Sequence, residues 1–346
     1  MAAVPFKTTP PKSNNAAQQE SGITDQEEPA EEPMLDLALF SDTHLGSATG
    51  LKAKNLIKGL DNLTLNFPGI DALLFSGDLS NSGKLDSLTA FYQAILEHSP
   101  VSKFICAGGN HDIGHSKLEM PEARNLLVEL FNQYSGEKTE HVYYSTDVKG
   151  YKVIVLCDDL SEKKNRPLLS QEQIDFLDKE LADGTKDAKP VFVICHWPLA
   201  GTNGLAKLWK NGGVNEEQTA QIKNILRKYN NVFFISGHTH GGITNLKFDL
   251  KHGYSYVERD YGVTYLSLPA FGAFNRHCIF SPSLFVHLEV FEDHVTIVPS
   301  SLRSLKLYPD YDRTVELNTE SGINLEYEPE PEPEELEELI DTIDAK

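Results

Sequence analysis

Five short apolar runs, each followed closely by Asp, Asn or His, constrain the fold of this chain more than any other feature. The runs are residues 37–40, 72–75, 104–106, 191–194 and 232–235. Short continuous runs rich in Val, Ile and Phe are typical of strands buried on both faces of a sheet. The polar clusters that follow them are Asp42-Thr43-His44, Gly77-Asp78, Gly109-Asn110-His111-Asp112, His196 and Gly237-His238-Thr239-His240. We therefore expect five strands to deliver these polar residues to one edge.

The chemistry of these clusters favours a metal site. Open α/β sheets bind ligands beyond the carboxyl ends of their strands. Carboxylate, amide and imidazole groups gathered there suit hard or borderline divalent metals better than metals that prefer thiolates. A single ion takes roughly four to six such donors, and the clusters supply eight. Taken singly, each Asp could be a helix cap and each His a core residue, but five clusters in order favour two metal ions.

In this order the clusters resemble the motifs of the calcineurin-like metallophosphoesterase family, over roughly residues 34–300. Asp42-Thr43-His44, Gly77-Asp78-Leu79 and Gly109-Asn110-His111-Asp112 most resemble the branch that is similar to cyclic-nucleotide phosphodiesterases. The resemblance implies an α/β fold with four layers, in which a two-sheet β-sandwich is flanked by helices. The alternation of expected strands and helices along the chain agrees with that fold.

The resemblance also implies how the metal ligands are divided. Asp78 would bridge two divalent ions, which could be Mn, Fe, Zn or Ni. The remaining ligands of the first ion would be Asp42, His44 and His240, and those of the second ion would be Asn110, His196 and His238. Seven residues would thus hold two ions, and a hydroxide that bridges the ions would be the nucleophile.

Two further residues have catalytic roles by the same resemblance. His111 would lie near the leaving oxygen and donate a proton or a hydrogen bond to it, which suits an imidazole with an ordinary pKa of ~6.5. Asp112 would orient the His111 ring, and the alternative is a purely structural carboxylate. Glycines before the ligands, such as Gly77 and Gly237, would allow positive φ or a close backbone approach.

The sequence thus predicts a dimetal phosphoesterase that prefers phosphodiesters to phosphomonoesters. The alternatives are a phosphomonoesterase or protein-phosphatase-like activity, and a non-catalytic scaffold on the same fold. The charge distribution argues against a nuclease. Of the net charge of −20, residues 326–346 carry −9 and residues 1–33 carry −4, which leaves −7 for the body. An acidic body is poorly suited to bind a nucleic-acid backbone, so we expect a small phosphorylated substrate.

Composition divides the chain into three parts. Residues 1–33 are polar and proline-containing, which is typical of disorder. Residues 34–305 form the predicted metallophosphoesterase domain, and residues 306–346 form an acidic tail rich in Pro and Glu. The tail could be a solvated spacer, or a short acidic helix that docks on a protein partner. No apolar run is long enough to cross a membrane and no secretory signal is evident, so we expect a cytoplasmic protein.

Periodicity and capping signals place the elements between the clusters. Helices are expected over residues 51–65, 84–97, 118–134, 170–181 and 215–229, and a hairpin over residues 142–157. After the last cluster, strands are expected over residues 263–268, 284–291 and 295–298.

Several other residues have open interpretations. The four widely spaced cysteines are expected to be buried free thiols: Cys106, Cys157, Cys195 and Cys278. His115, His277 and the loop 199–214, with Lys207, Trp209 and Lys210, could contact substrate or have no functional role.

Overall fold

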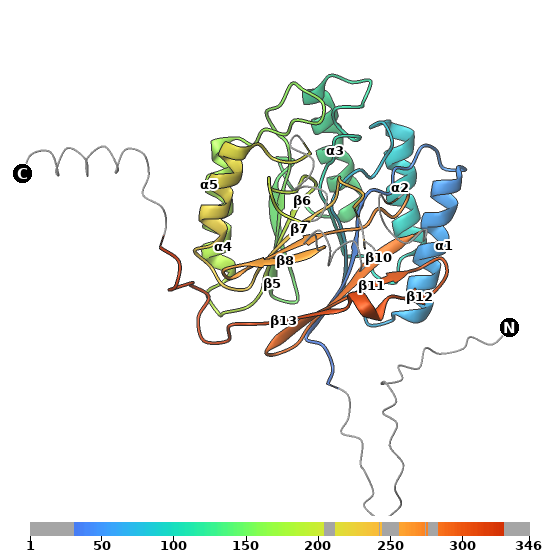
Figure 1. The fold of residues 1–346 in the computed structure, drawn as a ribbon. Helices are drawn as coiled ribbons and strands as arrows, with labels where there is room; N and C mark the ends of the chain where they lie inside the picture. Colours follow the sequence, from blue (N-terminus) through green and yellow to red (C-terminus); the bar gives the residue numbers. More distant parts are fainter. Residues whose placement is uncertain are drawn as a thin grey trace, which may run out of the picture.

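The computed structural model describes residues 31–203, 212–241, 243, 256–273, 275 and 283–328. Two mixed β-sheets lie face to face in it, and helices cover their outer faces (Figure 1). The four-layer sandwich predicted from the sequence is thereby confirmed. Within the described ranges, no helix is both long enough and apolar enough to cross a membrane.

The first sheet contains the strands that lead to three of the five clusters. Its strands are β1 (Leu35–Phe40), β2 (Ala72–Phe75), β3 (Phe104–Cys106), β10 (Leu284–Val290), β11 (His294–Ser301), β12 (Lys306–Leu307) and β13 (Arg313–Glu316). The strand order is β12-β11-β10-β1-β2-β3, and β13 pairs with β11. Because β1, β2 and β3 are parallel, their carboxyl ends lie at the same edge.

The second sheet contains the strands that lead to the other two clusters. Its strands are β4 (Tyr144–Val148), β5 (Tyr151–Leu156), β6 (Val191–Cys195), β7 (Val232–Ser236), β8 (Val257–Asp260) and β9 (Val263–Ser267). The order is β4-β5-β6-β7-β9-β8, with β5, β6, β7 and β9 parallel. The short strands β8, β12 and β13 were not predicted from the sequence.

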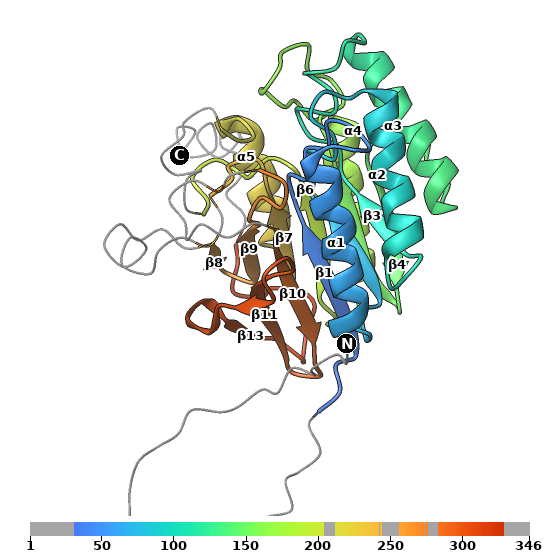
Figure 2. The same cartoon turned by 90° about the vertical axis from the view of Figure 1, so that its right-hand side faces the viewer.

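The helices are α1 (Leu51–Asn66), α2 (Leu85–His98), α3 (Met120–Ser135), α4 (Gln171–Gly184) and α5 (Glu216–Leu226). Helices α1 to α3 lie on the side of the first sheet, and α4 and α5 lie on the side of the second (Figures 1 and 2). Ser170 caps the start of α4, because its hydroxyl accepts the Gln173 N–H at 3.2 Å. The five predicted helices are all present, with small shifts at their ends.

Alternation along the strands separates two cores. In β1, Leu35, Leu37 and Leu39 belong to the core between the sheets, whereas Ala38 and Phe40 belong to the core under the helices. All five are fully buried, as expected for strands covered on both faces. Because both faces of these strands are buried, their sequences are continuous apolar runs and do not alternate between apolar and polar residues.

The predicted boundary between domain and tail at residue 305 differs from the structure. Strand β13 pairs with β11, and Tyr308, Tyr311 and Val315 are buried in the core between the sheets. These apolar side chains are separated by charged residues, so the sequence around them resembles a solvated segment. The folded part of the chain therefore continues past residue 305.

A segment after β13 is held against the body by asparagine side chains. Asn231 and Asn318 exchange two hydrogen bonds of 2.8 Å, from Asn231 Nδ2 to the Asn318 carbonyl and from Asn318 N–H to Asn231 Oδ1. The Asn230 amide donates to the carbonyls of Ser321 and Ile323, and the Asn324 amide donates to that of Arg227. Residues 317–324 are thus bound to the region between α5 and β7.

We expect removal of residues 317–346 to lower the free energy of unfolding by about 3–6 kcal/mol, because several partly buried hydrogen bonds worth ~1 kcal/mol each are lost. Removal of residues 329–346 alone should change it by less than about 0.5 kcal/mol. Chemical denaturation of the two truncated proteins measures the difference. Equal stability of the two would contradict the anchoring role of residues 317–328.

Several predictions concern residues outside the described ranges. These are the disorder of residues 1–30, the docking helix in the tail, and the roles of Lys207, Trp209, Lys210, His277 and Cys278.

Candidate metal centre

The five clusters meet at the carboxyl ends of the parallel strands. Asp42 follows β1, Asp78 follows β2 and Asn110 follows β3 in the first sheet. His196 follows β6 and His238 follows β7 in the second sheet. Because the two sheets pack face to face, residues separated by 196 positions come into contact, as in the 3.1 Å pair between the Nε2 atoms of His44 and His240.

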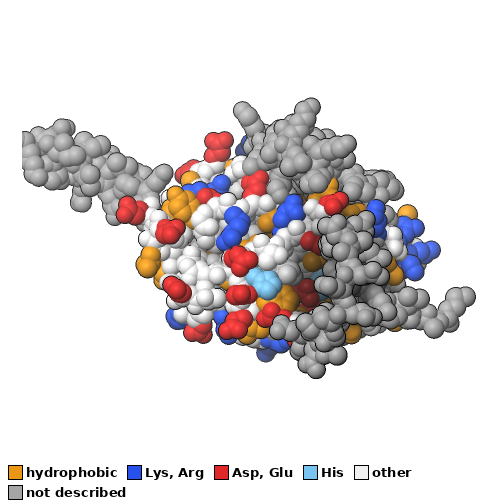
Figure 3. All heavy atoms as spheres, turned by 60° about the horizontal axis from the view of Figure 1, so that its bottom comes forward, with side chains coloured by type: hydrophobic (Ala, Val, Ile, Leu, Met, Phe, Trp, Pro, Cys, Tyr) orange, Lys and Arg blue, Asp and Glu red, His pale blue; other side chains and the backbone are white. Residues whose placement is uncertain are grey.

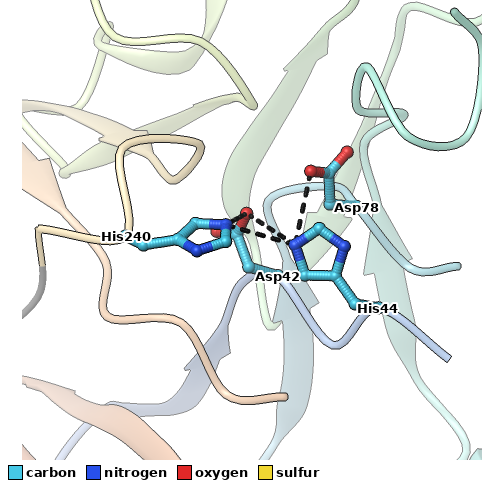
Figure 4. Close-up of side chains that lie close together, drawn as sticks. All are labelled: Asp42, His44, Asp78 and His240. Atoms are coloured by element: carbon cyan, nitrogen blue, oxygen red, sulfur yellow. Dashed lines mark hydrogen bonds and ion pairs between the residues drawn. The ribbon is translucent and has the colours of Figure 1, made fainter. Parts of the chain in front are cut away.

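The first group of donors contains Asp42, His44, Asp78 and His240 (Figure 4). Asp42 Oδ1 lies 2.9 Å from His240 Nε2 and 3.6 Å from His44 Nε2. Asp78 Oδ2 lies 3.6 Å from His44 Nε2. The four ligand atoms lie within 4.8 Å of one another, so they could hold one metal ion.

The second group contains Asn110, His196 and His238, with Asp78 beside it. Asn110 Oδ1 lies 3.0 Å from His196 Nε2 and 2.8 Å from His238 Nδ1. Asp78 Oδ2 lies 3.4 Å from His196 Nε2. The other ring nitrogen of His196, Nδ1, is bound to the Ser76 carbonyl at 2.9 Å, which turns Nε2 toward the group. The same Asp78 oxygen therefore lies close to both groups.

Five of the seven predicted ligands have a left-handed backbone conformation. Their φ values are 55° for Asp42, 49° for His44, 51° for Asp78, 65° for His238 and 49° for His240. Such a conformation is uncommon for residues other than glycine, and Asp and His tolerate it better than most. Strained residues of this kind concentrate at functional sites. No signal in the sequence predicted this conformation at the ligands themselves.

The glycines before the ligands serve mainly to allow close contact. Gly77 has a positive φ of 103°, as expected. At Gly109 a Cβ atom would lie 2.2 Å from Asp78 Oδ1, and at Gly237 it would lie 1.8 Å from Ser41 Oγ. A side chain at either position would displace a loop that carries a ligand.

Burial and mutual attraction set the charges in the centre. Burial by itself would raise the pKa of Asp78, but His196 lowers it to about 2. Burial would lower the pKa of His196, but Asp78 and Asp42 raise it to about 9. His240 similarly helps to hold the pKa of Asp42 well below its usual value, against burial. Burial and the nearby His196 lower the pKa of His238 to about 3. The two carboxylates are therefore ionised and require positive charge.

The donor set fits divalent cations. Two fully buried carboxylates cost free energy unless cations pair with them. Imidazole nitrogens face one another in two pairs, at 3.1 Å for His44 and His240 and at 3.2 Å for His196 and His238. Each of these pairs places nitrogen lone pairs beside carboxylate or amide oxygens. Divalent ions satisfy such converging lone pairs, and their binding displaces the protons of the imidazoles.

His111 lies beside the first group of donors. Its ring packs edge-on against His44 at 4.5 Å between centroids and stacks on His115 at 4.3 Å. Its backbone N–H donates to Asp78 Oδ1 at 2.8 Å, and its Nδ1 binds the Asn81 carbonyl at 2.8 Å. Burial is the main cause that lowers the pKa of His111. Because Nδ1 is occupied, Nε2 is the ring nitrogen available to a substrate.

The expectation that Asp112 orients the His111 ring is corrected by its contacts. Asp112 Oδ2 accepts the N–H groups of Leu79 and Gly109 at 3.0 and 3.1 Å. Its Oδ1 accepts the N–H and the hydroxyl of Ser80 at 2.8 and 2.9 Å. The Asn81 carbonyl, rather than Asp112, holds the ring of His111. Asp112 instead joins the loop after β2 to the loop after β3.

A profile of proteins described as calcineurin-like phosphoesterases matches residues 35–242, more than half of the chain. The chain belongs to the calcineurin-like phosphoesterase family. A relative from Ruthia magnifica subsp. Calyptogena magnifica, named a probable cyclic nucleotide phosphodiesterase, is 26% identical over 206 residues, which cover 58% of this chain and 76% of that protein. The family resemblance predicted from the five clusters is therefore confirmed.

Solved structures of phosphatases have the same fold. A purple acid phosphatase from yellow lupin matches with a TM-score of 0.57 and 14% identity, over 84% of this chain and 55% of that chain. A dimetal phosphatase from Danio rerio matches with a TM-score of 0.52 and 13% identity, over 83% of this chain and its whole own length. At these identities the likeness shows the fold alone.

Lys52 lies near the predicted ligands, although no pattern in the sequence marked it as part of the site. It lies in the first turn of α1 and is partly buried. Burial lowers its pKa, and the charges of Asp78 and Asp42 oppose that shift, so Lys52 adds positive charge to the region. Cys195 is a buried free thiol, as expected, and burial raises its pKa to about 12.

Proposed function

We propose that the protein is a dimetal-dependent phosphoesterase that hydrolyses phosphodiesters in preference to phosphomonoesters. The observation that carries this proposal is the meeting of all seven predicted ligands in two adjoining groups. Oxygen and imidazole donors of this kind bind Mn, Fe, Zn or Ni. Membership of the calcineurin-like phosphoesterase family supports the same reaction class.

When bound, two divalent ions polarise the phosphoryl group and supply a nucleophile from water near neutral pH. Asp78 would join the two metal sites, since its Oδ2 lies 3.6 Å from His44 Nε2 and 3.4 Å from His196 Nε2. The Ser76 carbonyl fixes His196, and the His238 N–H fixes Asp42 through a 3.1 Å hydrogen bond. These contacts hold the ligands in place before a metal or a substrate arrives.

His111 would act on the leaving group. With Nδ1 bound to the Asn81 carbonyl, the imidazolium form would present its Nε2 proton to the leaving oxygen. Burial lowers the pKa of His111 and disfavours that charged form, and the Asp78 carboxylate and the Asn81 carbonyl oppose this shift. A proton donor that is held in a fixed orientation contributes about 10²–10⁴-fold to the rate of such reactions.

The preference for a small diester rests on two observations. The relative from Ruthia magnifica carries the name of a probable cyclic nucleotide phosphodiesterase. The body of the chain between residues 34 and 325 carries a net charge of −7. A nucleic-acid backbone is bound by clustered Lys and Arg side chains, and acidic and basic side chains are interspersed on the uncovered part of the lower face in Figure 3. All seven ligands are present, which argues against a scaffold that has lost catalysis.

A comparison of esters tests the proposed function. The full chain loaded with Mn²⁺ should cleave bis(p-nitrophenyl) phosphate with a kcat/KM at least about tenfold above that for p-nitrophenyl phosphate, a difference of about 1.4 kcal/mol. Cyclic nucleotides should also be hydrolysed. Hydrolysis of the monoester alone would overturn the diester preference, and absence of any hydrolysis with Mn²⁺, Fe²⁺, Zn²⁺ or Ni²⁺ would favour the scaffold.

A further inference from the structure

A clasped loop over residues 158–168 lies beside the metal centre. Asp158 Oδ1 accepts the N–H groups of Ser161 and Leu168 at 2.9 and 3.1 Å, which joins the two ends of the loop. Arg124 of α3 donates to the carbonyls of Asp158 and Ser161 at 3.0 and 2.6 Å. These contacts, which are buried or partly buried, give the loop a defined shape, although its tip is exposed.

The tip of this loop carries an unusual concentration of positive charge. Lys163, Lys164 and Arg166 lie within four positions, and no other window of that length in the sequence contains three Lys or Arg residues. All three are exposed. Among the described residues, none of them has an ion-pair partner. Exposed cations of this kind contrast with the acidic body of the protein.

The loop contacts the turn that carries His111 and His115 directly. Asn165 Oδ1 lies 3.3 Å from His115 Nε2, and the His115 ring stacks on the ring of His111 with an interplanar angle of 3°. The Lys164 backbone packs against Gly114, where a Cβ atom would lie 3.1 Å from the Lys164 Cα. One imidazole ring thus separates the loop tip from the proposed proton donor.

We infer that Lys163, Lys164 and Arg166 form a subsite for a second anionic group of the substrate, such as a phosphate that is not hydrolysed. The inference rests on the proposed function, because it concerns the same site. The metal ions would neutralise the phosphoryl group under attack, so a second anion needs other cations. Lys163 and Arg166 also line a hollow of ≈ 700 Å³, together with Glu162 and Glu216.

Two substrates that differ only in the second phosphate test this subsite. They are the p-nitrophenyl ester of thymidine 5′-phosphate with a free 3′-hydroxyl and the same ester with a 3′-phosphate. With the Mn²⁺-loaded full chain, we expect kcat/KM to be about tenfold higher for the 3′-phosphorylated ester, since three exposed cations each contribute modestly. Replacement of Lys163, Lys164 and Arg166 by Ala should abolish this preference, while hydrolysis of the 3′-hydroxyl ester changes by less than about twofold.

A matched variant controls for total charge. In this variant, Ala replaces three exposed lysines. They are Lys149 in the turn between β4 and β5, Lys179 on α4 and Lys186 after α4. This variant should keep the preference. The proposed subsite is wrong if the wild type cleaves both esters equally, or if the loop variant, in which Ala replaces Lys163, Lys164 and Arg166, keeps the preference. The phosphoesterase proposal stands in either case.

A binding measurement separates this inference from catalysis. Thymidine 3′,5′-bisphosphate should bind the wild type about tenfold more tightly than the loop variant in calorimetry, even if neither ester is hydrolysed. Equal affinities would overturn the subsite. The subsite would also be overturned if an oligonucleotide bound the wild type more tightly than the bisphosphate does and if this binding required the same three residues. That result would indicate nucleic-acid binding.

Discussion

Replacement of Asp78 by Asn should lower kcat/KM for a phosphodiester by roughly 10³-fold, which corresponds to about 4 kcal/mol of transition-state stabilisation. The Asp78 carboxylate lies close to both groups of donors, so its charge serves both metal sites. An amide preserves the shape of the side chain but removes that charge. Steady-state kinetics with bis(p-nitrophenyl) phosphate and Mn²⁺ measure the effect, and metal analysis should show that less than two Mn²⁺ remain per chain.

Asp36 provides a matched control for this substitution. It is a buried aspartate at the other end of β1, where it binds His287. Asp36, His287 and Glu289 also form a compact group of possible ligands. Asp36→Asn should leave kcat/KM within about twofold and the Mn²⁺ content unchanged, since the group lies far from the carboxyl ends of the strands. Equal losses in the two variants would contradict the assignment of Asp78.

Replacement of Asp112 by Ala should lower the free energy of unfolding by about 3–6 kcal/mol. Asp112 is 1% exposed, and its carboxylate accepts hydrogen bonds from Leu79, Ser80 and Gly109. Without it, three buried N–H groups lose their partner, at a cost of about 1–3 kcal/mol each before relaxation. Urea denaturation in the presence of a chelator measures this change without a contribution from metal binding.

Ser80→Ala is the control for the Asp112 prediction, because it removes one hydroxyl group and keeps the Asp112 carboxylate. It removes only the 2.9 Å bond from Ser80 Oγ to Asp112 Oδ1 and the 2.8 Å bond from the Gly83 N–H, so we expect a loss of about 1–2 kcal/mol. If Asp112→Ala unfolds like the wild type and yet loses activity, Asp112 acts on His111 and the loop-joining role is wrong.

The sequence predicted the structure best at the strands whose two faces are both buried. The runs before Asp42, Asp78 and His196 are continuous because strands β1, β2 and β6 lie between two cores. Parallel pairing then brings the ends of these strands to one edge. The convergence of the ligands was therefore predictable from local pattern and general topology.

Features that depend on three-dimensional contacts were not predictable. The partners of Asp112 are backbone N–H groups of two loops, and any residue can supply such groups. The left-handed backbone conformation of His238 and His240 has no signature in the sequence. The attachment of residues 306–328 depends on single tyrosine and asparagine side chains among charged residues, which local composition does not reveal.

Anomalous diffraction from crystals grown with Mn²⁺ tests the central claim most directly, namely that seven residues from two sheets hold two metal ions. We predict two anomalous peaks roughly 3.5–4 Å apart. One peak should lie among Asp42, His44 and His240 and the other among Asn110, His196 and His238, with Asp78 touching both. A single peak, or peaks that do not contact Asp78, would contradict the dimetal centre.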